Sequence, residues 1–324
     1  MILIGKTIKR LRNQNNISQR ELACKLNVSC QTISKWEKGD SYPDITTLPL
    51  IADFFHITID ALFSGVVECA DETITESSKI HLEENHKGWN HAVEANWSGG
   101  TILPQYGPYT PTEEELHLFE DLQDKSVLEL ACGNGESMIY MSKQGAKELY
   151  GLDISEVQIE VARQILLENN IKAELFISPM EINPGIPFHH FDCVYSIYGI
   201  GWAQDIEKVF RLVSKYLKPK GYFIFSWDNP ILPCIENREG GYVLSQSYVT
   251  EKGKYIKKFG QQIYYKSWKL STYINALIDA GFELERIIEE SDNCAENATY
   301  SDKYYSEHKA GYINHSIIIK ARKK

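Results

Sequence analysis

The fold of most of this chain is decided by the stretch Val127-Leu-Glu-Leu-Ala-Cys-Gly-Asn-Gly135. Its first five residues are mainly apolar, as in a short buried strand. Glycines follow at positions 133 and 135, and glycine lets the backbone pass close beneath a ligand. A strand that ends in such a loop indicates a ligand-binding turn at the edge of an α/β sheet.

Strand-like and helix-like segments alternate beyond this loop. Short β-rich runs cover 127–131, 149–153, 173–177, 191–197 and 222–227, and helical runs cover 136–144, 155–169 and 205–217. This alternation predicts a parallel sheet with helices on both faces. Ligands of such sheets bind at the carboxyl ends of the strands, near the switch in strand order.

An acidic residue, Asp153, ends the second strand, 18 residues beyond Gly135. An acid here can hold both hydroxyls of a ribose, in dinucleotide sites and in other nucleoside sites alike. A dinucleotide fingerprint needs a third glycine, where this chain has Met138. Instead, Glu129 could meet an amine, and the loop has no Lys or Arg for a phosphate. A ligand with an adenosine, an amino acid and no phosphate fits this pattern, and S-adenosylmethionine is such a ligand.

Further motifs follow in an order that resembles the class I methyltransferases, which use S-adenosylmethionine. They are the Glu129–Gly135 loop, Gly151–Ser155, Ser178–Glu181, Phe191–Tyr198, Leu217–Gly221 and Ile274–Glu283, and the resemblance spans roughly residues 86–322. It implies a Rossmann-like α/β fold with a doubly wound, mostly parallel, seven-stranded sheet. The sequence departs from the family at two points: it has Lys220 in place of a frequent Gly and no His between 199 and 205. The family's substrate-binding residues are therefore harder to assign to this chain than its cofactor-binding residues.

The resemblance also implies a set of cofactor-binding residues. Glu129 would orient the methionine part, Asp153 would hold the ribose, and Ser196 would lie beneath the reactive sulfur. Met180 and Glu181 would flank the adenine, although Met180 could instead be a core residue and Glu129 a solvated or capping acid. The complete set is Glu129, Ala131, Gly133, Asn134, Gly135, Asp153, Ile154, Pro179, Met180, Glu181 and Ser196.

Methyl transfer from a sulfonium is an in-line displacement, so positioning can supply much of the acceleration without a protein nucleophile. No catalytic residue and no metal site is therefore predicted. The candidates for a base by residue type are His189, His190, Tyr198, His308 and His315, and each is more readily explained as a surface or packing residue. Trp89, Tyr106 and Trp202 could wall an acceptor pocket, and the tyrosine-rich insertion 230–266 is expected to shape it.

The class of methyl acceptor is narrowed by motifs that the sequence lacks. Amino methylation of DNA bases uses an Asn/Asp-Pro-Pro-aromatic loop after the fourth strand, where this chain has Ser196-Ile-Tyr-Gly199. Cytosine-carbon methylation uses a Pro-Cys nucleophile there, whereas Pro233-Cys234 follows the fifth strand. Residues 67–324 hold 26 Lys and Arg against 38 Asp and Glu, which disfavours gripping a phosphate polymer. A small-molecule acceptor is expected.

Near the start of the chain, apolar residues in two short runs, 4–11 and 22–26, repeat at helical rather than strand spacing. Ser18 and Glu21 form a capping-box pattern, which starts a helix, and Ser29 can cap the next one. Asn27 lies between these helices, and Asn tolerates the left-handed backbone of a tight turn. The pattern predicts two short helices that cross closely.

This segment resembles the Cro/repressor-type helix-turn-helix family over residues 4–64. The matching residues include Ser18-Gln19, Leu22-Ala23, Val28-Ser29 and Thr32 to Gly39, with Asn27 where the family usually has Gly. By this resemblance the DNA-binding residues are Gln19, Ser29, Gln31, Thr32 and Lys35. Such modules read half-sites as dimers, so a homodimer on double-stranded DNA is expected. A protein-protein module is the alternative.

Length and composition fit a protein of two domains. Of 324 residues, 43% are hydrophobic and 24% charged, which excludes disorder or a coiled coil for the whole chain. We predict an all-α helix-turn-helix domain over 1–65, an acidic linker or loosely packed helix over 66–85 and the α/β domain over 86–324. Scattered cysteines, no signal peptide and no long apolar run favour a cytoplasmic protein without a membrane segment.

Three functions remain open on the sequence. The leading one is a small-molecule methyltransferase with a sequence-specific DNA-binding head. The second is a transcription regulator whose methyltransferase-like domain senses S-adenosylmethionine or a metabolite without turnover. The third is a DNA methyltransferase directed by its head.

Overall fold

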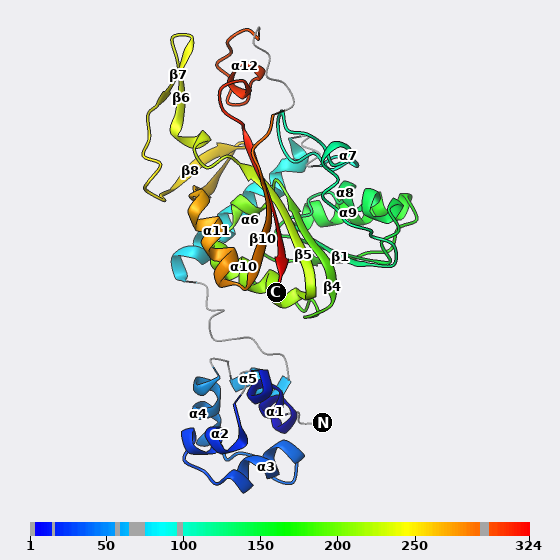
Figure 1. Ribbon diagram of the computed structural model, residues 1–324, viewed down its shortest axis with the longest axis vertical. Coiled ribbons are helices and arrows are strands. Elements are labelled where there is room, and N and C mark those ends of the chain that lie inside the picture. Colours follow the sequence, from blue (N-terminus) through cyan, green and yellow to red (C-terminus); the bar gives the residue numbers. More distant parts are fainter. Residues whose placement is uncertain (1–3, 15–16, 56–58, 65–74, 96–99, 292–297) are drawn as a thin grey trace. The chain divides into compact units, whose positions relative to one another are not determined.

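The computed structural model describes residues 4–14, 17–55, 59–64, 75–95, 100–291 and 298–324. The chain divides into two compact units, Met1–Ile74 and Thr75–Lys324, which we call the N-terminal and C-terminal units (Figure 1). Each unit has its own core of buried apolar side chains.

The described residues of the N-terminal unit form a bundle of five short helices. They are α1 (Ile4–Gln14), α2 (Gln19–Lys25), α3 (Cys30–Lys38), α4 (Thr47–Phe54) and α5 (Ile59–Ser64). Ser18 and Glu21 form a capping box, and Asn27 has a left-handed backbone with φ of 53°. Ile33 and Trp36 of α3 are buried in the core of this unit. The predicted all-α bundle is confirmed.

A part-buried ion pair joins α1 to α3 within this unit. Arg12 Nε donates to Glu37 Oε1 at 2.6 Å, and Arg12 Nη2 donates to Glu37 Oε2 at 3.2 Å. The Gln19 side-chain amide donates to the same Oε2 at 2.7 Å. The Glu37 side chain is only 3% exposed, and its hydrogen bond raises the pKa of the Arg12 guanidinium. This ion pair links α1 to α3. Hydrophobic periodicity in the sequence does not reveal it.

In the described part of the C-terminal unit, seven strands form one sheet in the order β10-β11-β5-β4-β1-β2-β3. The strands are β1 (Ser126–Leu130), β2 (Glu148–Asp153), β3 (Glu174–Ile177), β4 (Phe191–Ile197), β5 (Leu217–Asp228), β10 (Phe282–Ile288) and β11 (Ser316–Lys323). Strands β1 to β5 are parallel, and β11 runs antiparallel between β5 and β10. The predicted doubly wound, mostly parallel sheet is confirmed.

Helices cover both faces of this sheet. They include α8 (Glu136–Lys143), α9 (Glu156–Glu168), α10 (Ile206–Tyr216) and α11 (Leu270–Asp279). Phe210 of α10 and Tyr273 of α11 belong to one core cluster, and Met138 of α8 belongs to another. Neighbouring residues of β1 alternate between these clusters, because Leu128 faces the first and Val127 the second. Along the described residues, none of the helices has the length and apolarity to cross a membrane.

The segment predicted as a linker, 66–85, is helical in its second half. Residues 66–74 lie outside the described residues, and α6 (Glu76–Glu94) begins after its N-cap, Thr75. Asn85 of α6 donates to the Tyr264 carbonyl at 3.0 Å and accepts from the Tyr264 amide at 2.7 Å. The second unit therefore starts at Thr75 and not at 86. In the described part of this stretch Glu83 is exposed and Leu82 is buried, as in a packed helix with one exposed side.

The predicted insertion, 230–266, forms two antiparallel hairpins beside the main sheet. They are β6 (Ile235–Arg238) with β7 (Gly241–Leu244), and β8 (Gly253–Lys258) with β9 (Gln261–Lys266). Strand β9 packs against α6, so the second hairpin and this helix are neighbours in the structure.

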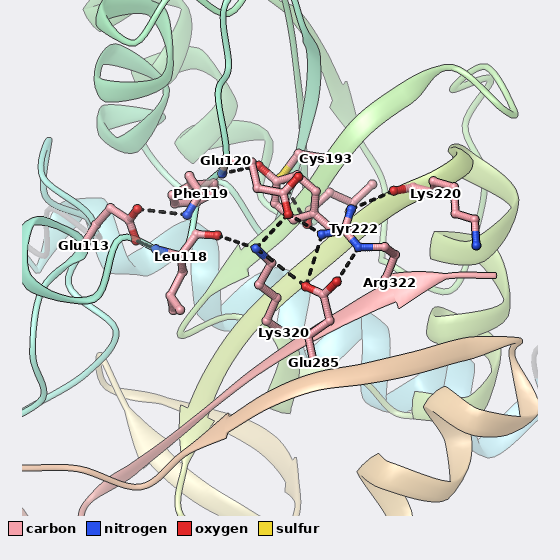
Figure 2. Close-up of polar contacts among 11 residues, drawn as sticks. Glu113, Leu118, Phe119, Glu120, Cys193, Lys220, Tyr222, Glu285, Lys320 and Arg322 are labelled. Carbon is pink, nitrogen blue, oxygen red and sulfur yellow. Dashed lines mark hydrogen bonds and ion pairs between the residues drawn. The ribbon is translucent and has the colours of Figure 1, made fainter.

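Polar contacts tie the segment that leads into β1 to the antiparallel end of the sheet (Figure 2). Lys320 of β11 donates to the Leu118 carbonyl at 2.9 Å and to Glu120 at 3.1 Å. Arg322 pairs with both Glu120 and Glu285. These contacts hold the approach to β1 against β10 and β11.

Candidate active site

A cavity of about 590 Å³ lies along the carboxyl ends of the parallel strands. Residues that follow or end β1 to β5 line one side, and residues of α6, β8 and β9 line the other. From the predicted cofactor set, this lining contains Ala131, Gly133, Asp153, Ile154, Pro179, Met180 and Glu181. The cavity therefore lies where open α/β sheets bind their ligands.

Asp153 is fixed by two backbone amides. Its Oδ2 accepts from the Gly133 amide at 2.9 Å, and its Oδ1 accepts from the Ser155 amide at 2.8 Å. Gly133 has a φ of 51°, in the left-handed region that favours glycine. Burial raises the pKa of the Asp153 carboxyl. The glycine loop and the acid, 18 residues beyond Gly135, thus form one rigid part of the cavity wall.

Glu129 lies in a smaller cavity of about 250 Å³, which shares Ala131 with the larger one. Glu129 is 4% exposed. Its Oε2 accepts from Ser137 Oγ at 2.6 Å and from Tyr195 Oη at 3.0 Å. Burial raises the pKa of Glu129 to about 8. Glu129 is thus a buried acid inside a cavity, and neither a solvated acid nor a helix cap.

Met180 and Glu181 line the larger cavity after β3. Met180 also packs in the core cluster on that face, which confirms its interpretation as a core residue, and its contact with adenine stays a prediction. Glu181 accepts a hydrogen bond from the Gln204 amide at 2.6 Å, and burial raises the pKa of its carboxyl.

Three further residues of the predicted set lie outside the larger cavity. Asn134 lines the smaller cavity. Gly135 is the N-cap of α8, where an added Cβ would lie 3.1 Å from the Ala162 Cβ on α9. Ser196 is fully buried, and its hydroxyl has no hydrogen-bond partner among the described residues. Its neighbour Tyr198 lines both cavities instead.

A buried acid at the end of β5, Asp228, was missed by the sequence analysis. It lines the larger cavity with Tyr198, Tyr304 and Tyr305, and we call these four residues the Asp228 cluster. Tyr305 donates to Oδ1 at 2.8 Å, Tyr304 donates to Oδ2 at 3.2 Å, and Tyr198 also donates to Oδ1. Burial raises the pKa of Asp228. Its position at the carboxyl end of a parallel strand is the signal that could have found it.

Aromatic side chains form much of the remaining wall. Trp89 of α6 and Trp202 line the larger cavity, as does Tyr265 of β9. Lys258 lies over two of these rings, with its Nζ 4.8 Å from the Trp89 centroid and 5.1 Å from the Trp202 centroid. Tyr106, the third aromatic residue suggested for the pocket, is fully buried outside both cavities.

The histidines suggested as bases lie outside both cavities. His189 and His190 precede β4, and His190 pairs with Glu148 at 2.8 Å. His308 contacts the hydroxyl of Tyr242 at 2.8 Å. His315 is buried, which lowers its pKa to about 4.

Comparison with known families identifies both units. Residues 127–221 match the methyltransferase domain family, and residues 8–62 match a helix-turn-helix family. The chain joins a helix-turn-helix domain to a class I methyltransferase domain. The two matches agree with the observed sheet and helical bundle.

Individual relatives each resemble part of this two-domain chain. A solved S-adenosylmethionine dependent methyltransferase from Mesorhizobium loti shares the fold with a TM-score of 0.55 and 21% identity, over 64% of this chain and 95% of its own. The HTH-type transcriptional activator BcrR of Enterococcus faecalis is 47% identical over 106 residues, 32% of this chain and 50% of BcrR. An uncharacterized protein of Haemophilus influenzae is 25% identical over 186 residues, 54% of this chain and 73% of its own. The chain thus spans only half of BcrR.

The helix-turn-helix domain carries its predicted DNA-binding residues on and around α3. Gln31 and Lys35 are exposed on this helix, and Thr32 is half-buried. Ser29 caps α3, because its hydroxyl accepts from the Thr32 amide at 3.0 Å. The Gln19 side chain bonds to Glu37, as described above. Gln31 and Lys35 are therefore the members of the set best placed to reach a groove.

Proposed function

We propose that this protein is an S-adenosylmethionine-dependent methyltransferase that acts on a small molecule and carries a sequence-specific DNA-binding domain. The observation that carries the proposal is the pair of buried acids, Asp153 and Glu129, on either side of the glycine loop. The residues present suit the cofactor: one acid for a ribose diol, one for an ammonium group. Among the described residues that line the smaller cavity, none is a Lys or Arg that would favour a phosphate.

The protein's part in the reaction is to bind and orient. When bound, S-adenosylmethionine supplies an electrophilic methyl group on a positively charged sulfur. Asp153 would accept hydrogen bonds from the ribose hydroxyls, and Glu129 would pair with the amino group of the methionine part. Met180 and Glu181 would flank the adenine. The buried walls exclude water and hold donor and acceptor together, which is the main source of acceleration in an in-line displacement.

A small acceptor is supported by the size of the cavity and by the net charge of the segment that contains it. The larger cavity, at about 590 Å³, is within the usual range for small-molecule sites. It is closed on one side by α6 and the β8–β9 hairpin. The excess of acidic residues over 67–324 opposes the binding of a phosphate polymer.

The test of the enzyme function combines binding and turnover. Titration calorimetry should show one molecule of S-adenosylmethionine bound per chain, and incubation with labelled cofactor and a metabolite extract should label a small molecule. Label found in DNA would instead favour a DNA methyltransferase. Absence of cofactor binding would end the enzyme hypothesis.

A second candidate function is supported by the DNA-binding domain itself. In this case the protein is a cytoplasmic transcription regulator, binding DNA as a homodimer, whose other domain senses the cofactor without turnover. The 47% identity to a transcriptional activator over 106 residues favours it. A gel-shift titration separates the candidates: a sensor changes its operator affinity when the cofactor is added and yields no methylated product.

Cofactor binding is expected to release a proton from Glu129. At pH 7 its carboxyl, with a pKa of about 8, is mostly protonated without ligand. A ligand ammonium favours the carboxylate and lowers this pKa, so affinity should rise up to about tenfold per pH unit between pH 6 and 8. Calorimetry of S-adenosylhomocysteine binding in buffers of different ionisation enthalpy measures the released proton. The Glu129→Gln variant should lack this proton; an equal release from the variant would assign it elsewhere.

A further inference from the structure

The end of the larger cavity near β5 differs chemically from the cofactor end. The Asp228 cluster lies there, and the Asp228 carboxylate is 6% exposed. A carboxylate at such depth needs hydrogen bonds or a cation to offset the loss of water. The cluster is not used by the residues proposed to bind the cofactor, so it is available to the acceptor.

The hydroxyl protons of this cluster are already used inside the protein. Each phenol has one O–H, and those of Tyr304 and Tyr305 point to Asp228 at 3.2 and 2.8 Å. Burial raises the pKa of both phenols, so they keep these protons. Their oxygens therefore offer a ligand lone pairs, as the carboxylate does. A group that binds here must bring its own hydrogen-bond donors.

The aromatic rings beside the cluster suit a cation. The Trp227 ring lies next to two other aromatic rings. Its centroid is 5.3 Å from that of Tyr198 and 5.4 Å from that of Trp202. Trp202 already holds the ammonium group of Lys258 over its face, at 5.1 Å. Ring faces attract cations because of their negative quadrupole. Lys258 also acts on Asp228, because its positive charge counteracts the rise in the pKa of that carboxyl, so the wall beside the cluster already favours positive charge.

We infer that the methyl acceptor is an amine, which binds as an ammonium ion at the Asp228 cluster and is methylated on nitrogen. This inference rests on the proposed methyltransferase function. The ammonium ion gives one proton to the Asp228 carboxylate. The nitrogen lone pair then bonds to the methyl carbon as the carbon–sulfur bond breaks, and that bond's electron pair stays on sulfur. The products are an N-methylated ammonium ion and S-adenosylhomocysteine, and Asp228 passes its proton to solvent.

Other acceptor classes match the cluster less well. A hydroxyl brings one donor hydrogen and no charge, whereas a primary ammonium brings three donor hydrogens and a positive charge. A carboxylic acid, ionised at neutral pH, would meet oxygen lone pairs and the negative charge of Asp228. Both classes enter the experiment as competing outcomes.

The experiment compares three probes with one aromatic body: 2-phenylethylamine, 2-phenylethanol and 3-phenylpropionate. Each is titrated by calorimetry into the full chain saturated with S-adenosylhomocysteine. We expect the amine to bind at least tenfold more tightly than the other two. In Asp228→Asn this preference should fall below threefold, and Tyr304→Phe should reduce it in part. The control Glu289→Gln, an exposed acid that bonds to Asn229, should keep the full preference.

The outcomes separate this inference from the proposed function. Equal binding of the three probes, no binding by any of them, or an unchanged preference in a folded Asp228→Asn would overturn the amine inference. Unchanged S-adenosylhomocysteine affinity shows that each variant is folded. Labelled methyl on an alcohol or acid oxygen would support the methyltransferase function and contradict the amine inference. A clear amine preference in a chain that binds no S-adenosylmethionine would support an amine-binding site and contradict the methyltransferase function.

Discussion

Replacement of Asp153 by alanine is expected to weaken S-adenosylmethionine binding by roughly 100-fold or more. A charged carboxylate that accepts two ribose hydroxyls contributes about 1.5–3 kcal/mol per hydrogen bond, and 1.4 kcal/mol corresponds to a tenfold change in affinity. The change also leaves the Gly133 and Ser155 amides without their carboxylate partner. The glycine loop would lose its fixed position. Titration calorimetry on the full chain measures the effect.

Two further variants serve as controls for the Asp153→Ala result. Asp153→Asn keeps the shape and one acceptor oxygen, so it should lose less affinity than Asp153→Ala. Asp279→Ala removes an exposed acid at the end of α11 and should bind like the unmodified chain. A folded Asp153→Ala chain with affinity within threefold of normal would show that Asp153 does not hold the ribose.

Replacement of Glu37 by alanine is expected to unfold the helix-turn-helix domain and abolish DNA binding. The change leaves the part-buried Arg12 guanidinium with only its hydrogen bond to the Ile17 carbonyl, and breaking a fully buried pair costs about 3–5 kcal/mol, which is an upper bound here. A domain of this size has little stability to lose. Hydrogen exchange of peptides from residues 19–38 in the full chain reports the loss directly, and a gel shift reports the loss of DNA binding.

The double variant Arg12→Met, Glu37→Leu tests the physical cause. It removes both buried charges, so much of the lost protection should return. Protection should be unchanged in the C-terminal unit, which has its own core. A Glu37→Ala chain with normal exchange over residues 19–38 would mean that the ion pair adds little to stability.

Local sequence patterns predicted most of the fold because they report burial along single elements. The strand at 191–197 and the helix near 155–169 were found from apolar spacing, and Asn27 was found from the backbone it permits. Strand β5 starts at Leu217, five residues before its apolar run, since its first residues pair with β4 through Phe191. The first half of helix α6 was assigned to a linker or a loosely packed helix because its composition is polar and acidic, whereas the helix packs against β9.

The candidate site was predictable only where one motif holds its residues. Gly133 and Asp153 were found because one follows the first predicted strand and the other ends the second, and they are hydrogen-bonded in the structure. Asp228, Tyr304 and Tyr305 are separated by some 75 residues, and tertiary folding alone brings them together. Ser196 was expected in the site, but the end of β4 presents Tyr198, which has a left-handed backbone with φ of 55°.

The order of strands in the sheet also has a consequence during synthesis. Strand β11 is inserted between β5 and β10, yet it leaves the ribosome after all of them. At roughly 5–20 residues per second, it emerges on the order of 10 to 50 seconds after α5. A nascent chain can therefore fold its helix-turn-helix domain well before the sheet of its methyltransferase domain is complete. Chains released early would carry a folded helix-turn-helix domain and an incomplete methyltransferase domain.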